Sequence, residues 1–222
     1  MAKRLGLSLG VLAVILIAAG GWSVLRATPQ SDTTAPQAVA PQARAPQAFR
    51  HDPAADYSLK LSISGEGANG VIVIDLDEAA APGHVKRITE LASERAYDNV
   101  VFHRVIDGFM AQTGDVQFGK LGGDMAQAGR GGSDRPDLQA EFSDVAFERG
   151  AVGMARSRSP HSANSQFFIM FAPAPHLNGQ YTVVGQVTEG FEVLDAIKRG
   201  TGSNGAVVGA PDVMVSVDVV TN

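Results

Sequence analysis

Two segments of the chain carry side chains whose types and spacing could do chemistry. The first segment, 102–115, contains Arg104, Met110 and Gln112. If this segment is extended, strand alternation places Phe102 and Arg104 on one face and His103 on the other, and Met110 and Gln112 likewise share a face. The apolar and amide side chains would form the floor of a site, and the arginine beside them would be its one fixed cation.

The second segment, 154–170, places Gln166 and Phe168 on one face by the same alternation. Two interpretations of the segments remain open from spacing alone. In the first, both line a binding slot around Arg104. In the second, they only fill the interior of a β-structure, because apolar strand residues are mostly core residues, and Arg104 makes a surface ion pair.

Other motifs do not add a second chemistry. The pattern G-x-x-x-x-G-K at 114–120 is followed by Leu121, where a phosphate-binding loop needs Ser or Thr. The five histidines lack H-x-x-x-H spacing and the chain has no cysteine, so we expect no metal site and no cofactor. Asp107 and Asp115 could be an acid–base pair, although turn formation is the commoner role of Asp at such positions.

Composition favours a globular protein that does not bind nucleic acid. The chain has 222 residues, 45% of them hydrophobic, and a formal net charge of -5, which argues against binding that depends on neutralising phosphates. The charge is unevenly spread. Residues 1–50 carry five cationic side chains against one anionic, and residues 51–222 carry 13 against 22.

The N-terminus has the pattern of a membrane signal. Lys3 and Arg4 precede an uncharged run over 5–25 that Arg26 closes. A helix of that length can cross a hydrocarbon core of about 30 Å, and the two leading cations favour a cytoplasmic N-terminus. We therefore predict that 1–26 is a signal anchor or a signal peptide. The length of the run favours the anchor over the cleaved form.

A spacer follows the apolar run. Residues 27–55 are rich in Pro, Ala and Gln, with an Ala-Pro-Gln triplet at 35, 40 and 45, and such sequence tends to extended conformers. We expect a folded domain over 56–222. Its predicted location is the periplasmic side of a bacterial cell envelope, anchored in the inner membrane by residues 5–25.

The folded part reads as mainly β. Alternation over 57–76 around Asn69-Gly70 predicts a hairpin, a helix should begin at Pro82, and a second helix is expected over 191–199. Further strands are expected at 100–105, 109–113, 151–155, 166–171, 181–187 and 213–220. Many short strands with two helices indicate an antiparallel barrel or sandwich, and closure of the sheet would remove its edges.

The two chemical segments are similar to those of one known family. The sequence FHRVIDGFMAQTGD, with NSQFFI further on, resembles the cyclophilin family of peptidyl-prolyl cis/trans isomerases over about 57–221. The resemblance implies a closed eight-stranded antiparallel barrel capped by two α-helices. In this chain, one N-terminal apolar helix would precede that barrel.

The resemblance also implies roles for individual residues. It makes Arg104 the catalytic arginine, with Gln112 beside it as a polar positioning group. The residues it implies for substrate binding are Phe109, Met110, Ala155, Arg156, Gln166, Phe168, His176, Leu177 and Tyr181. Ala155 and Arg156 would offer their backbone to the substrate.

Three residues depart from the common family pattern. His176 stands where many members have Trp, Asp107 replaces a common Pro, and Arg156 replaces a common Asn. Because cyclosporin binding in the family depends on that Trp, we expect weak inhibition by such ligands.

The implied reaction needs no metal, cofactor or nucleophile. Twisting an X–Pro amide frees a lone pair on the prolyl nitrogen, and a guanidinium aimed at that nitrogen would stabilise the twisted state alone. The implied substrates are proline-containing polypeptides, unfolded or exported, and we expect a monomer. A non-catalytic peptide-binding module on the same barrel is the alternative function.

Overall fold

The computed structural model describes residues 45–49 and 57–221. All of them belong to one compact unit, Ala43–Asn222. The predicted leader over 1–26, with its apolar helix, lies outside the described residues, as does most of the spacer over 27–55. Within the described ranges, no helix combines the length and apolar character needed to cross a membrane.

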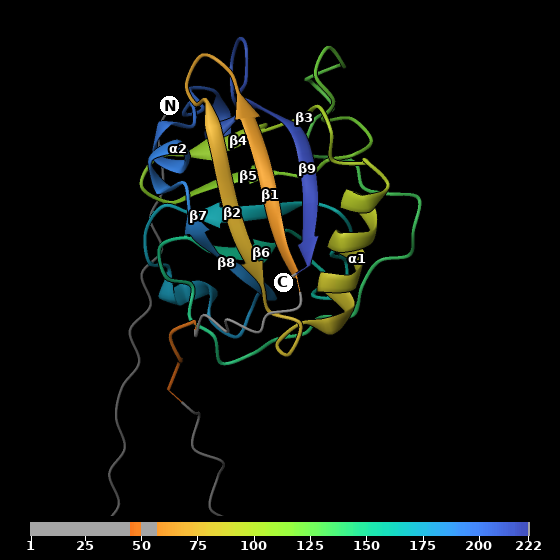
Figure 1. Cartoon of the computed structure of the whole chain (residues 1–222), viewed down its shortest axis with the longest axis vertical. Helices are drawn as coiled ribbons and strands as arrows, with labels where there is room; N and C mark the ends of the chain where they lie inside the picture. The colour runs from red at the N-terminus through yellow and green to blue at the C-terminus, as the bar shows by residue number, and fades with distance from the viewer. Residues whose placement is uncertain (1–44, 50–56, 222) are drawn as a thin grey trace, which may run out of the picture. The chain divides into compact units, whose positions relative to one another are not determined.

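The described part of the chain forms one mainly antiparallel sheet of nine strands. The strands are β1 (Tyr57–Ser64), β2 (Gly70–Leu76), β3 (Val100–Val101), β4 (Arg104–Ile106), β5 (Met110–Thr113), β6 (Ala151–Met154), β7 (Phe167–Met170), β8 (Val183–Glu189) and β9 (Val213–Thr221). Their order in the sheet is β3-β9-β1-β2-β8-β6-β7-β5-β4. Figure 1 shows β1, β2 and β9 side by side in front, with β5, β6 and β7 crossing behind them.

The predicted hairpin over 57–76 is confirmed as β1 and β2. Alternation along β1 buries Leu59 and Leu61 and leaves Lys60 exposed, as a strand with one face on a core requires. On its other side β1 pairs with β9, where Leu61 faces Val217. The first and last strands of the domain are therefore neighbours in the middle of one sheet layer.

The sheet curls, but its strand pairing does not close into a ring. The strands at the two ends of the order, β3 and β4, do not pair with each other in the described structure, so the expected closed eight-stranded barrel is not confirmed. The strand expected over 100–105 is interrupted at Phe102, whose N–H donates to the Asp212 carbonyl. The Val101 N–H donates to the Gly119 carbonyl at 2.9 Å, so a loop occupies this edge.

Two α-helices flank the sheet. Helix α1 (Pro82–Ser93) lies beside β9 and buries Val85, Ile88 and Leu91 against it, as the helical spacing predicted (Figure 1). Helix α2 (Phe191–Ala196) lies beside β2 and is shorter than the expected 191–199. The Lys198 N–H donates to the Asp212 carboxylate at 2.7 Å instead of to a helix carbonyl, so α2 ends early.

A long segment without helix or regular strand joins β5 to β6, and one buried carboxylate organises it. Asp115 accepts backbone N–H groups from Gln117, Phe118, Gly129 and Gly131 at 2.7–3.1 Å. These bonds fold the glycine-rich stretch back onto the end of β5. Two short 3-10 turns, η1 (Pro175–Leu177) and η2 (Ser203–Gly205), complete the described elements.

Candidate active site

A small cavity of about 180 Å³ collects most of the residues predicted to act on substrate. Its lining consists of Arg104, Phe109, Met110, Gln112, Ala155, Arg156, Phe168, Leu177 and Tyr181. These are nine of the eleven residues named from the sequence. We call this cavity the apolar slot.

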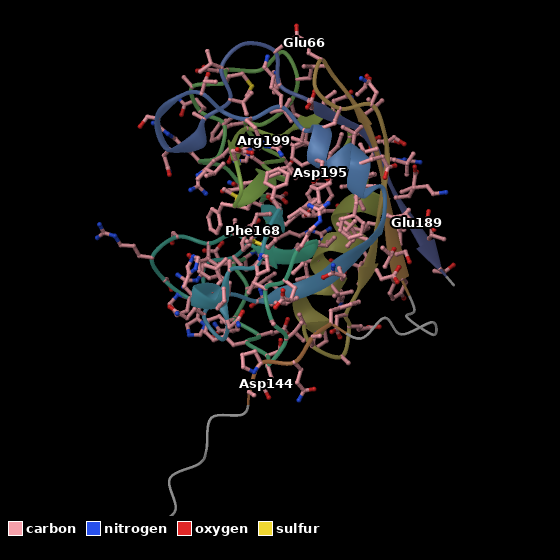
Figure 2. All side chains as sticks on the ribbon, turned by 90° about the vertical axis from the view of Figure 1, so that its left-hand side faces the viewer. Glu66, Asp144, Phe168, Glu189, Asp195 and Arg199 are labelled. Atoms are coloured by element: carbon pink, nitrogen blue, oxygen red, sulfur yellow. The ribbon has the colours of Figure 1, made fainter. Side chains whose placement is uncertain are left out.

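Strand pairing assembles the walls of the slot. Antiparallel register places Gln112 of β5 opposite both Arg104 of β4 and Phe168 of β7. Phe168 lies on the side of the molecule away from β1 and β9 (Figure 2). The slot is therefore built on the rear layer of strands, while the front layer and α1 enclose the larger core.

Aromatic rings pack against Phe168 and support this wall of the slot. The Phe147 ring stacks against Phe168 with centroids 5.7 Å apart, and Tyr181 meets Phe168 edge to face at 5.9 Å. Gly153 of β6 makes this packing possible, because a Cβ there would lie 2.5 Å from atoms of both the Phe147 and Phe168 rings. A side chain at this position would push Phe168 toward the slot.

Arg104 is held by neutral groups. Its Nη1 donates to the Gln112 side-chain oxygen at 3.1 Å, and its Nε and Nη2 donate to the main-chain and side-chain oxygens of Asn204 at 3.0 Å each. No carboxylate of the described residues pairs with it, so within this part of the chain Arg104 does not make the surface ion pair considered from the sequence. Partial burial lowers the pKa of the Arg104 guanidinium, which nevertheless stays protonated at neutral pH.

Two amide side chains extend this network into an adjoining cavity of about 370 Å³. Gln112 Nε2 donates to the Gln166 side-chain oxygen at 2.9 Å, and Gln166 Nε2 donates to the Gly131 carbonyl at 2.8 Å. Gln166 lines this second cavity, the polar cavity, and not the apolar slot. It therefore reaches the slot only through Gln112.

His176 lies at the rim of the slot and is not part of its lining. Its exposed ring stacks on Phe109 with centroids 5.8 Å apart and planes 27° apart. The turn η1 that carries His176 also supplies Leu177, which is buried in the wall.

The two aspartates weighed as an acid–base pair have separate structural roles. Asp115 is buried, and its carboxylate accepts hydrogen bonds from backbone N–H groups, as described above. Asp107 is exposed and accepts a hydrogen bond from Arg199 Nε at 2.9 Å, which lowers the pKa of the Asp107 carboxyl. Turn and loop formation, not acid–base chemistry, explains both residues.

His103 is separated from the slot, as strand alternation predicted, but the prediction that Phe102 shares the face of Arg104 is wrong, because Phe102 is buried in the main core. Its ring is buried against Gly129, whose hypothetical Cβ would lie 2.9 Å from it. Burial lowers the pKa of the His103 imidazole and so favours its neutral form.

Sequence reasoning missed three residues that shape the site: Asn204, Phe147 and Gly153. Asn204 adopts a left-handed conformation at φ 55°, which suits Asn in a turn. The Ser-Asn-Gly sequence of η2 signals such a turn, but nothing in it indicates Arg104 as its partner. Phe147 and Gly153 could have been found only from the pairing of β6 with β7.

These features define a class of protein. A curled antiparallel sheet carries an apolar slot that presents one guanidinium and side-chain amides. Among the described residues, the slot lining contains no serine, cysteine or histidine. Such a site is suited to binding an extended peptide and acting on it without a covalent intermediate.

Comparison with known proteins identifies the family. Residues 59–219 match the family model described as cyclophilin type peptidyl-prolyl cis-trans isomerase/CLD. A probable peptidyl-prolyl cis-trans isomerase of Brucella suis is 51% identical over 170 residues, which cover 76% of this chain and 84% of that protein. Peptidyl-prolyl cis-trans isomerase B of Bacillus subtilis is 38% identical over 130 residues, or 58% of this chain and 84% of that one.

Solved structures agree with this assignment at the level of the fold. A Cryptosporidium parvum cyclophilin, crystallised in the presence of the dipeptide Ala-Pro, matches with a TM-score of 0.61 at 24% identity. The match covers 74% of this chain and 99% of that one. The chain belongs to the cyclophilin-type peptidyl-prolyl cis-trans isomerase family, and it is an enzyme of that class.

Proposed function

We propose that this isomerase accelerates cis–trans isomerisation of X–Pro bonds in exported polypeptides, with Arg104 stabilising the twisted amide. The observation that carries the proposal is the placement of a braced guanidinium in the lining of an apolar slot. A proline ring fills such a slot by burial of apolar surface. The X–Pro amide would then lie beside Arg104.

Arg104 has donors left for a substrate. A guanidinium carries five N–H groups. Each of the three nitrogens of Arg104 makes one bond to Asn204 or Gln112, and Nη1 also donates to the Met110 sulfur at 4.0 Å. The second N–H of Nη2 therefore remains for a ligand in the slot, and the N–H that faces Met110 has only a weak acceptor, which a ligand can replace. Bracing on two sides fixes their direction before the substrate arrives, which is the condition for electrostatic preorganisation.

The proposed chemistry follows from amide resonance. Rotation about the X–Pro bond meets a barrier of about 18–20 kcal/mol because the twisted amide loses its resonance. The prolyl nitrogen regains a lone pair only in that state. A hydrogen bond from Arg104 to this nitrogen stabilises the transition state and neither ground state, so it lowers the barrier in both directions.

An exchange assay tests this function. The full-length chain in mild detergent should speed cis–trans exchange of an Ala-Ala-Pro-Phe peptide, whose uncatalysed interconversion takes about 10–100 s. The alternative, a peptide-binding module, would bind the same peptide without changing its exchange rate. Binding with an unchanged rate would therefore overturn the proposed activity.

We further propose that the isomerase domain over 56–222 works on the periplasmic side of the inner membrane. The charged start and long uncharged run over 1–26, followed by the spacer over 27–55, support this topology. A periplasm-dependent reporter fused after Asn222 should be active. Activity only of a cytoplasm-dependent reporter would contradict the topology, and a mature N-terminus near residue 21 would contradict the tether alone.

A further inference from the structure

Arg156 lies where the apolar slot meets the polar cavity. This residue belongs to the lining of both cavities, and only Gln112 and Ala155 share that position. A peptide with its proline in the slot and a neighbouring residue in the polar cavity would cross this junction. Because adjacent Cα atoms are about 3.8 Å apart, that neighbouring residue would lie close to Arg156.

Neutral groups fix the guanidinium of Arg156 in this position. Its carbon lies 4.3 Å from the centroid of the Tyr181 ring, over the face of that ring. Its Nε and Nη2 donate to the Gln180 carbonyl at 3.3 and 3.0 Å, and its Nη1 donates to the Ser157 carbonyl at 3.0 Å. No ion pair of the described residues involves Arg156, so its positive charge is held without a counter-charge.

The charges around the junction reinforce that of Arg156. Arg104 lines the slot, and Arg130 lines the polar cavity, with an exposed side chain. The one acidic side chain in these two linings, within the described ranges, is the exposed Asp137. The site is thus locally positive, although residues 51–222 as a whole are acidic.

We propose that Arg156 determines substrate specificity by charge. It selects proline segments that carry an Asp or Glu side chain within two residues of the proline. The inference rests on the isomerase function above and deepens it, because it names a class of substrate. Arg156 acts here through its side chain, whereas the family resemblance assigned only its backbone to the substrate.

A competing explanation gives Arg156 a purely structural role. Its bonds to Gln180 and to the start of the loop after β6 would then serve only to fix that loop. Such a role predicts that substitution of Arg156 changes kcat/KM by the same factor for all substrates. A charge-selecting role predicts a change in the ratio between acidic and basic substrates.

The experiment measures that ratio. Cis–trans exchange NMR on the full-length chain gives kcat/KM for peptides with Glu, Gln or Lys at each of the two positions before and after one proline. Direct NMR is needed because a coupled protease has a charge preference of its own. At about 10 mM salt, we expect Glu to exceed Lys by about fivefold at one or more positions.

Two variants locate the source of the preference. Arg156→Gln keeps hydrogen-bond donors but removes the charge, and the Glu-to-Lys ratio should fall below about twofold. Arg158→Gln is the matched control, because it removes one exposed charge two residues away that lines neither cavity. It should retain the ratio. In the unmodified protein, about 0.5 M salt should also collapse it.

The outcomes separate this inference from the proposed function. Exchange catalysis of the Gln peptide by the unmodified protein supports isomerase function whatever the charge ratio is. Glu-to-Lys ratios below about 1.5 at all four positions would overturn the charge selection. So would a ratio that survives Arg156→Gln or that falls equally in Arg158→Gln.

Discussion

Arg104 and Asn204 lie 100 residues apart in the chain, and two hydrogen bonds of 3.0 Å join them. Both acceptors belong to Asn204, one on its main chain and one on its side chain. The catalytic arginine of the proposed mechanism therefore depends on a turn near the C-terminus for its direction. Gln112 supplies the opposing contact from β5.

Replacement of Arg104 tests the mechanism directly. Arg104→Ala should lower kcat/KM by about 10²–10³, the usual loss for one preorganised donor. Arg104→Lys should recover little, because a flexible ammonium cannot reproduce the braced planar fork. The thermal midpoint, measured on the same samples, should move little. A rate near that of the unmodified protein in folded Arg104→Ala would overturn the mechanism.

Asn204→Gly tests whether Asn204 positions Arg104. Glycine accepts the left-handed backbone at φ 55° and keeps the main-chain acceptor, while the side-chain oxygen is lost. The loss of one hydrogen bond, about 1 kcal/mol, should lower kcat about fivefold with KM nearly unchanged. In an Arg104→Ala background, Asn204→Gly should not lower kcat any further. Additive losses in the double variant would mean that Asn204 acts independently of Arg104.

Gly153→Ala tests the support beneath the slot. The new Cβ would lie 2.5 Å from ring atoms of Phe147 and Phe168, so at least one ring must move. We expect a loss of about 1–3 kcal/mol in the free energy of unfolding, together with a higher KM as Phe168 intrudes on the slot. Adding Phe147→Leu should restore part of the lost free energy of unfolding and lower KM toward its original value. An unchanged melting temperature and KM would show that the packing is looser than described.

The acid stability of the domain should depend on Glu141. This carboxylate accepts the N–H groups of Gly83 and His84 at the start of α1, both at 3.0 Å, and lies 2.5 Å from His84 Nδ1. Burial raises the pKa of Glu141, but the hydrogen bonds from His84 and Gly83 outweigh it and leave the pKa below its usual value. A depressed pKa means that the unfolded state binds the proton first as pH falls.

The contribution of Glu141 is therefore complete above its unfolded pKa of about 4.3 and is lost as pH falls below that value. Glu141→Gln should lower the melting temperature by about 2–4 °C at pH 7 and should flatten its decline between about pH 4.5 and 3. Glu148→Gln changes an exposed carboxylate seven residues further along the chain. It is the control and should keep the original slope. Equal slopes for Glu141→Gln and the unmodified protein would contradict the assignment.

Inhibitor binding should respond to residue 176. His176 stacks on Phe109 at the rim, where an indole would bury more apolar area and add an N–H donor. His176→Trp should therefore strengthen inhibition by cyclosporin, which should be weak for the unmodified protein. Inhibitor titration of both proteins decides the matter, and nanomolar inhibition of the unmodified chain would overturn the argument.

Local sequence rules predicted the elements that depend on neighbours in the chain. Alternation located β1 and β2, helical spacing located α1, and the same-face rule brought Met110 together with Gln112 in the slot. These predictions succeed because one strand face or one helix face is buried. They required no knowledge of distant partners.

Features that depend on distant partners were not predictable in the same way. The end of α2 is set by Asp212, the brace on Arg104 by Asn204, and the contact below Phe168 by Gly153. Each joins segments whose proximity follows only from the order of the strands. The position of Arg156 in the lining of both cavities was not predicted for the same reason, since spacing gives a residue's face and not its neighbours.

The position of β9 has a consequence for how the protein is made. β9 is the last strand of the described residues in chain order, yet it lies between β1 and β3 and pairs with both. Until β9 has been synthesised, one side of β1 has no pairing strand. Pairing of β9 with β1 joins residues 149 to 164 positions apart, which makes it a slow step. The front layer of the sheet is therefore completed only once β9 is available to pair with both of its neighbours.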